Sequence, residues 1–427
     1  MLGSISAPEN QLQRRDRFRA YMQAFNPAAP PRDVIEAGLV LEDLHQSLYR
    51  NLAARADLEP GSQQLLVGGV GSGKTTELLL AREWLREQGH VLPLYFDISK
   101  ATDLAGLNTG SLVASFGLGL ARHLSEDFDD YKRKSKLHDE LGKAFEEVWS
   151  YAYGKNVTVW VSHDDSGPEP SADPWEDEEG HFTTRTVPGK LKPPLPSLHR
   201  DIQKIRGPLD EFLVAVRKTQ RDIVVTFDGL DRLLDATKFW TVAQQDFRLL
   251  RQLKVSVLAT APLSVLFGAG VGQSISDQFD RVHHLAVIAA DPHDSPLQSV
   301  LEKRGGSKML DLEAMSDICR FSGGVLRDLI SLARDSAEEA YVSDHDFVTI
   351  EDIQKVVLQL GEGYLRGLGP EAMKTLLKLE AFKSFQVNQP ANVELLLTRR
   401  VLEYSATDFR VHPALLSVIP KPELKRA

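Results

Sequence analysis

The feature that most constrains this chain is a glycine-rich stretch with the pattern G-x-x-x-x-G-K-[ST], from Gly68 to Thr75. The apolar run Leu65–Val67 precedes it, and a helical pattern begins at about Glu77. A strand, a glycine loop and a helix in this order predict a P-loop, in which backbone N–H groups and the positive end of the helix bind phosphate oxygens. We therefore expect this loop to bind a nucleotide.

The side chains of this loop have separate expected roles. Lys74 is expected to reach the β- and γ-phosphates, and the hydroxyl of Thr75 is placed to ligate Mg²⁺. The residues expected to contact the nucleotide are Gly68, Gly69, Val70, Gly71, Ser72, Gly73, Lys74, Thr75 and Thr76. The predicted ligand is ATP with Mg²⁺.

The length, charge and cysteine count of the chain exclude several classes of protein. The 427 residues allow about two or three domains, and the net charge of −10 argues against a protein that coats nucleic acid non-specifically. The single cysteine, Cys319, excludes a disulfide framework and a thiolate metal site. No run approaches the roughly 18 apolar residues of a membrane helix, and the Arg-rich segment 1–25 lacks the apolar core of a secretory signal. We expect a cytoplasmic protein.

Apolar β-type runs alternate with helical segments along the first 290 residues. The runs lie at 64–67, 91–98, 223–227, 255–261 and 281–287. This alternation predicts an α/β fold, a mostly parallel sheet with helices on both faces. Upstream, leucines at helical spacing predict a helix over 38–58, packed beside the nucleotide domain. The segment 38–40 either belongs to that packing or lines an adenine pocket.

Two acids follow the apolar run 223–227. Asp228 ends this expected buried strand and is the candidate second ligand of Mg²⁺. Asp231, three residues further on, either orients or deprotonates the attacking water or caps the next helix. Thr260 lies near the end of the following strand. Its hydroxyl either contacts the γ-phosphate or the attacking water, or forms a hydrogen bond with a backbone group.

A candidate phosphate-sensing arginine lies far downstream. Gly323 and Gly324 interrupt one helical segment, and Arg327 falls in the first turn of the next. An arginine there can lean toward the phosphates, and the alternative is a solvated side chain. No acid lies three or four residues away to pair with Arg327 along the helix.

With these elements in this order, residues 35–360 resemble the AAA+ superfamily and the adjacent STAND class of P-loop ATPases. The resemblance implies that Gly68–Thr75 is the Walker A motif and that Ile223–Asp228 is the Walker B motif, with Asp231 as the second acid. It also implies sensor 1 at or near Thr260 and sensor 2 at Arg327.

The resemblance further implies an arginine finger, a residue that completes the site of a neighbouring subunit, at Arg281. The chain departs from many AAA+ proteins at Gly229, which stands where they have the catalytic Glu directly after the Walker B Asp. This D-G-L-D arrangement is more similar to STAND switches. We therefore expect a slow, state-switching ATPase and not a processive motor.

The remainder of the chain is predicted to form two smaller domains. An all-α lid is expected over 291–360, with helices at 297–304, 312–321, 326–342 and 349–359. After a Gly-rich link over 361–369, helices at 370–383 and 391–399 and a hairpin at 401–412 resemble a winged helix. Only a few cations of this segment are candidates for DNA contact, so protein contact or autoregulation remains an alternative to DNA binding. These cations are Arg399, Arg400, Arg410 and His412.

The predicted domain map therefore has four parts. An N-terminal helical segment, 1–60, packs on the ATPase domain, 61–290, and the lid and the winged-helix-like domain occupy 291–360 and 361–427. A Pro-, Gly- and acid-rich stretch at about 154–196 is expected to be an inserted, exposed hairpin or loop. Its carboxylates match no calcium-loop spacing, so a solvated charge run is the expected state.

Three functions fit these observations. The first is an ATPase switch, a homo-oligomeric ring or arc that assembles a complex with a separate effector protein, as in bacterial defence, transposition or signalling. The second is an initiator-like ATPase that acts on DNA through the winged helix. The third is a nucleotide-binding scaffold with almost no hydrolysis.

Overall fold

The computed structural model describes residues 8–101, 103–126, 131–153, 201–218, 221–233, 236–267, 275, 277–290, 295–387 and 389–419. The chain divides into two compact units built from interleaved segments. The sheet unit consists of Leu48–Val67 and Glu77–His283. The helical unit consists of Met1–Ser47, Gly68–Thr76 and His284–Ala427. The insertion expected at about 154–196 lies outside the described residues.

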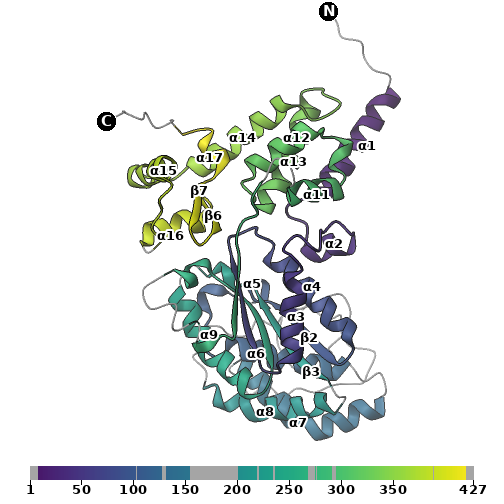
Figure 1. The fold of residues 1–427 in the computed structure, drawn as a ribbon. Coiled ribbons are helices and arrows are strands. Elements are labelled where there is room, and N and C mark those ends of the chain that lie inside the picture. The colour runs from purple at the N-terminus through teal and green to yellow at the C-terminus, as the bar shows by residue number, and fades with distance from the viewer. Residues whose placement is uncertain are drawn as a thin grey trace, which may run out of the picture. The chain divides into compact units, whose positions relative to one another are not determined.

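A five-stranded sheet with the order β2-β3-β4-β1-β5 forms the centre of the sheet unit (Figure 1). Its neighbours β2/β3, β3/β4 and β4/β1 pair in parallel. The strands are β1 (Gln63–Gly68), β2 (Val91–Asp97), β3 (Asp222–Asp228), β4 (Ser256–Ala261) and β5 (Arg281–Leu285). Every end lies within two residues of its prediction, which confirms the five expected strands and the α/β fold.

Burial explains the strand pattern. β1 and β4 are buried along their whole length, and β3 is buried after Asp222, as expected for parallel strands covered on both faces. β2 carries Pro93, which has no N–H for a sheet ladder, and β2 accordingly lies at one edge of the sheet.

Helices cover the sheet on both sides (Figure 1). The helix α3 packs against β3 and β4, α9 packs against β4, and α6 packs against β2 and α9. The helices are α3 (Leu48–Leu58), α4 (Lys74–Gln88), α5 (Ile98–Ala101), α6 (Ser111–Glu126), α7 (Tyr131–Tyr153), α8 (Gln203–Arg217) and α9 (Ala236–Gln252), with short 3₁₀ turns η1 (Leu104–Gly106), η2 (Leu230–Arg232) and η3 (Leu263–Leu266).

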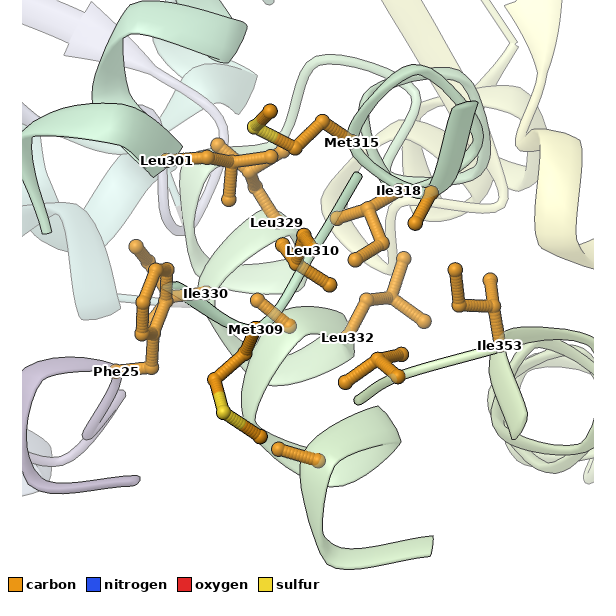
Figure 2. Close-up of a cluster of buried hydrophobic side chains, with 14 of the residues drawn as sticks. Phe25, Leu301, Met309, Leu310, Met315, Ile318, Leu329, Ile330, Leu332 and Ile353 are labelled. Carbon is orange, nitrogen blue, oxygen red and sulfur yellow. The ribbon is translucent and has the colours of Figure 1, made fainter. Parts of the chain in front are cut away.

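In the helical unit, four helices and a 3₁₀ turn surround an apolar core (Figure 2). They are α11 (Pro296–Lys303), η4 (Gly306–Lys308), α12 (Leu312–Phe321), α13 (Leu326–Val342) and α14 (Ile350–Leu365). The predicted bounds of α12 and α13 are confirmed, and α14 begins with a capping box between Thr349 and Asp352. Side chains such as Leu301, Ile318 and Leu329 fill the core.

The N-terminal segment divides between the two units. The helix α1 (Pro8–Ala24) packs against α13 and contributes Phe18 and Tyr21 to this core, and Phe25, directly after the helix, joins them. By contrast, α3 packs on the sheet. Residues 1–60 therefore do not pack as one segment, because Phe18 and Tyr21 of α1 are buried in the core of the helical unit and α3 packs on the sheet.

The helix predicted over 38–58 is wrong in its first half. Only α3, which begins at Leu48, is helical, and the preceding residues form turns after α2 (Pro31–Glu36). Gly38, Gln46 and Ser47 have positive φ angles, a backbone conformation that cannot continue a right-handed helix.

The C-terminal segment has the predicted helix–helix–hairpin order. Its elements are α15 (Pro370–Phe382), α16 (Pro390–Leu397), the antiparallel pair β6 (Val401–Ser405) and β7 (Asp408–Val411), and α17 (Pro413–Leu416). The expected Gly-rich link is shorter than predicted, because α14 continues to Leu365. A Cβ on Gly361 would lie only 2.3 Å from the carbonyl oxygen of Ala414, so this glycine allows α14 and α17 to pack closely.

Candidate nucleotide-binding site

The glycine loop connects β1 to α4, as the sequence predicts. Gly71 and Gly73 have φ angles of 84° and 98°, which L-residues with side chains rarely adopt. Lys74 is the first residue of α4, and only 5% of it is exposed. Its Nζ donates to the carbonyl oxygens of Gly68 (3.0 Å) and Gly69 (2.9 Å), so the ammonium group is folded back over the loop.

Two polar atoms beside the loop are buried and have no hydrogen-bond partner among the described residues. They are Oγ of Ser72 and Nε2 of His45. A Cβ on Gly73 would lie 3.2 Å from Nε2 of His45, so this ring packs directly against the loop. Burial lowers the pKa of His45, and a hydrogen bond with the backbone of Ser72 opposes that shift. The sequence analysis missed His45, which lies in the turn that was predicted to be helical.

Arg327 is the second residue of α13, in its first turn as predicted. A Cβ on Gly71 would lie 2.8 Å from the Cβ of Arg327, so the start of α13 lies against the loop. The side chain of Arg327 is exposed, and within the described residues it has no hydrogen bond or ion pair. Gly324, just before α13, allows a close approach to the segment after β5, because a Cβ there would lie 1.8 Å from the carbonyl oxygen of Ile288.

Asp228 lies at the carboxyl end of β3 in the sheet unit and is buried. Its carboxylate accepts hydrogen bonds from the N–H of Gly229 (2.7 Å) and the hydroxyl of Tyr95 (2.7 Å). Burial, and next the charge of Asp228, raise the pKa of Tyr95, which keeps the phenol a donor. Asp97 ends β2 in register with Asp228. Asp97 and Tyr95 were missed, although Asp97 follows an apolar run just as Asp228 does.

Gly229 explains why the chain departs from the usual Asp–Glu pair. Its φ angle is 80°, and a Cβ there would lie 2.9 Å from both Oδ1 of Asp97 and Cβ of Ser99. A glutamate side chain does not fit at this position. Asp231 lies within η2, whose N-cap is Gly229, so the helix-capping interpretation of Asp231 is wrong.

Thr260 lies level with the end of β3. Leu66 of β1 pairs with Thr260 of β4, and Phe227 of β3 pairs with Ala259. The next residue, Asp228, therefore lies at the carboxyl edge of the sheet, level with the ends of β4 and β1. Thr260 is fully buried and its Oγ1 accepts a hydrogen bond from the N–H of Leu230 (3.1 Å), as the backbone-satisfied alternative expects. This bond fixes the turn that carries Asp231.

Arg281 is exposed and is the first residue of β5. It lies at the amino end of this strand, whereas a Cβ on Gly68 would lie 2.7 Å from the carbonyl oxygen of Leu285 at the other end. Four residues of strand separate the two positions, roughly 13 Å. The arginine-finger role of Arg281 therefore stays a prediction of the sequence resemblance.

The four cations proposed for DNA contact all have partners inside the helical unit. Arg399 pairs with buried Asp328 (2.7 Å), and Nε2 of His412 lies 3.3 Å from the same carboxylate. Arg400 donates to the carbonyl oxygens of Tyr364 and Arg366, and Arg410 pairs with Asp408 (2.6 Å). A DNA contact by these side chains would require them to leave these partners.

Comparisons give fold-level similarity only. No family model matches the chain, and no curated protein matches it. Among solved structures, the ORC2 protein of Aeropyrum pernix in ADPNP–ADP complexes has a TM-score of 0.44 and 12% identity, over 86% of this chain and 88% of that one. The Cdc6p protein of Pyrobaculum aerophilum has a TM-score of 0.42 and 12% identity, over 92% and 96%.

The ORC1 protein of Aeropyrum pernix in complex with DNA has a TM-score of 0.41 and 15% identity, over 87% of this chain and 91% of that chain. None of these values assigns the chain to a family, so its function has to be inferred from its own residues. Within the described ranges, no helix is both long and apolar enough to cross a bilayer.

Proposed function

We propose that this chain binds ATP with Mg²⁺, hydrolyses it slowly, and acts as an AAA+-type molecular switch. The observation that carries the proposal is the glycine loop between β1 and α4, with Lys74 folded over it and Arg327 beside Gly71. Glycines with positive φ, a buried lysine and a helix start form the arrangement that a triphosphate requires.

The residues of the loop fit this ligand. Lys74 would leave the carbonyl oxygens of Gly68 and Gly69 for the phosphates, where its ammonium charge forms stronger, charge-assisted bonds. The partnerless Oγ of Ser72 is available as a further polar contact. Thr75 and Asp228 would hold Mg²⁺, which neutralises charge on the phosphates and orients them when it is bound.

The carboxylate side chains that follow β3 support slow turnover of ATP. Gly229 leaves no room for a glutamate, so Asp231 is the remaining candidate to orient or deprotonate a water. The bond from Leu230 to Thr260 holds the turn that carries Asp231, which makes Thr260 a positioning residue. An aspartate on a short 3₁₀ turn reaches less far than a glutamate at the strand end, which is consistent with a low rate.

A switch needs a connection from the nucleotide to another part of the chain. Asp328 follows Arg327 directly and accepts hydrogen bonds from Tyr364 (2.5 Å) and Arg399 (2.7 Å), with His412 at 3.3 Å. A movement of Arg327 toward a γ-phosphate would also displace Asp328. It would therefore change the contacts of Asp328 with Arg399 and His412, which hold the C-terminal hairpin. This network supports a nucleotide-dependent rearrangement of the C-terminal segment.

The finer parts of the proposal rest on the sequence resemblance. We propose a cytoplasmic homo-oligomer in which Arg281 completes the site of a neighbouring subunit. The C-terminal segment is proposed to be a winged helix used for protein contact, with a separate effector protein as the output. Bacterial defence, transposition and signalling are the proposed settings for such a switch.

Calorimetry with ATP and Mg²⁺, together with an assay of phosphate release, tests the proposal. Lys74→Met removes the ammonium group but keeps the length of the side chain, and we expect at least about a hundredfold weaker ATP binding. The exposed lysine in Lys204→Met provides the matched control and should bind ATP like the wild type. Equal ATP affinity of the Lys74→Met and wild-type proteins would contradict the proposal.

A further inference from the structure

A second hollow in the helical unit lies between α1 and α13, away from the glycine loop. Its volume is about 550 Å³, within the range of roughly 300–1,000 Å³ typical of small-molecule pockets. On α1 its lining residues recur at helical spacing, and Arg334 and Tyr341 of α13 line the other side. The lining residues are Arg15, Phe18, Arg19, Met22, Gln23, Asn26, Arg334 and Tyr341.

The arginines of α1 divide into two pairs with different surroundings. Arg14 donates to carbonyl oxygens of Tyr341 (3.1 Å) and His345 (2.8 Å), and Arg17 pairs with Asp346. These two side chains anchor α1. Arg15 and Arg19 are exposed and line the hollow, and within the described residues neither has a hydrogen bond or an ion pair.

Arg334 adds a third positive charge from α13. Its Nη1 has only a long bond of 3.4 Å to Oδ1 of Asn26, and its Nε is buried without a partner. Burial raises the pKa of Asp335, and the positive charge of the nearby Arg334 opposes this rise. The carboxyl group of Asp335 therefore offsets part of the charge of Arg334. Three guanidinium groups around one hollow repel one another unless an anion lies between them.

The floor of the hollow adds a second kind of contact. Phe18, only 2% exposed, and Tyr341, 38% exposed, form an edge-to-face pair at 5.3 Å, and the guanidinium of Arg14 lies 4.6 Å from the centroid of the Tyr341 ring. An aromatic floor favours a flat ring, and guanidinium forks bind phosphate oxygens bidentately. A compact hollow of this size suits a small molecule better than a polymer, which needs an extended basic track.

We propose that this hollow is a second ligand site, for a nucleoside phosphate whose phosphates bind Arg15, Arg19 and Arg334 and whose base contacts the exposed part of Tyr341. The site is independent of the glycine loop and of the function proposed for it. Because α1 packs on α13, which begins at the loop, occupancy of the hollow would also stabilise α13.

The test uses the full chain with Lys74→Met, so that the glycine loop no longer binds nucleotide. We expect a fluorescent N-methylanthraniloyl ATP probe to bind this protein, and ATP to displace it better than inorganic pyrophosphate. Adding Arg15→Gln and Arg19→Gln should weaken the probe at least about tenfold. The matched control adds Lys204→Gln on α8 and Lys218→Gln at its C-cap, which remove the same charge from exposed positions and should change nothing.

Three results would overturn the proposal. They are absence of probe binding to Lys74→Met, equal binding by the arginine variant, and displacement by an acidic peptide but not by ATP. Thermal unfolding of each variant checks that α1 remains docked, which we expect because Arg14 and Arg17 are unchanged. Failure of the glycine-loop proposal would appear separately, as equal ATP affinity with and without Lys74→Met when both proteins also carry Arg15→Gln and Arg19→Gln.

Discussion

The glycine loop of the helical unit and the strand ends of the sheet unit differ in how many of their polar atoms have hydrogen-bond partners. Around Asp228, the carboxylate, the neighbouring threonine and Asp97 all have short partners. Around the loop, Ser72 and His45 have buried atoms without partners, and Arg327 is exposed without an ion pair among the described residues. The strand ends are already ordered, whereas the loop retains unused hydrogen-bonding capacity.

This difference separates two requirements of a nucleotide switch. A group that holds a metal or positions a water works best when its geometry is fixed before the ligand arrives. A group that senses a phosphate must instead change partners on binding, as Lys74 can by leaving the carbonyl oxygens of Gly68 and Gly69. Substitutions at the strand ends should therefore affect turnover or folding, and changes beside the loop should have smaller, condition-dependent effects.

The largest effect is expected for Asp228→Asn. An amide has no negative charge for Mg²⁺, and we expect ATP turnover to fall about a thousandfold, equivalent to about 4 kcal/mol of barrier. Phosphate release at saturating ATP measures this, and Asp222→Asn at the exposed start of the same strand is the control. Normal turnover of Asp228→Asn would remove the strand ends from the catalytic site.

Installing the missing glutamate tests the ordering of the strand ends directly. Gly229→Glu should destabilise the protein by about 3 kcal/mol, because a side chain at a φ of 80° is strained and meets Asp97 and Ser99. The control is Gly363→Glu in α14, an exposed position where a Cβ has no atom within 4 Å and helix propensity favours the change. Faster ATP hydrolysis without loss of stability would contradict the account of Gly229.

Asp231→Asn should have an intermediate effect. We expect turnover to fall at least about tenfold, roughly 1.4 kcal/mol of barrier, with ATP affinity unchanged, because Asp231 is proposed to act on the water and not on the nucleotide. Single-turnover hydrolysis and calorimetry separate the two quantities. Unchanged turnover would favour the nucleotide-binding scaffold.

The sequence predicts the sheet better than the surroundings of the site. Buried parallel strands have continuous apolar runs, and Gly323 with Gly324 marks the start of α13, so these elements were predictable. The turn at 46–47 was not, because positive φ angles of Gln46 and Ser47 arise from tertiary packing. The pairing of Arg399 with Asp328 joins residues 71 positions apart, which no local pattern reveals.

The smallest effect concerns the pH dependence conferred by His45. Burial lowers its pKa below the ordinary value, so as pH falls the unfolded chain takes up this proton first. His45 therefore removes stability as pH falls below about 6.5. His283, with a pKa lowered to about 4, acts in the same direction, and Glu77, with a pKa raised to about 7, acts in the opposite one.

A comparison with His45→Gln cancels these other groups, because they are present in both proteins. Between pH 7.5 and 5.5, the midpoint of thermal unfolding should fall about 2 °C further in the wild type than in the variant. The imidazole of His45, whose Nε2 has no partner among the described residues, thus gives the stability of the protein a modest pH dependence. Parallel pH profiles of the two proteins would show that His45 is protonated equally in the folded and unfolded states, which would contradict its burial against Gly73.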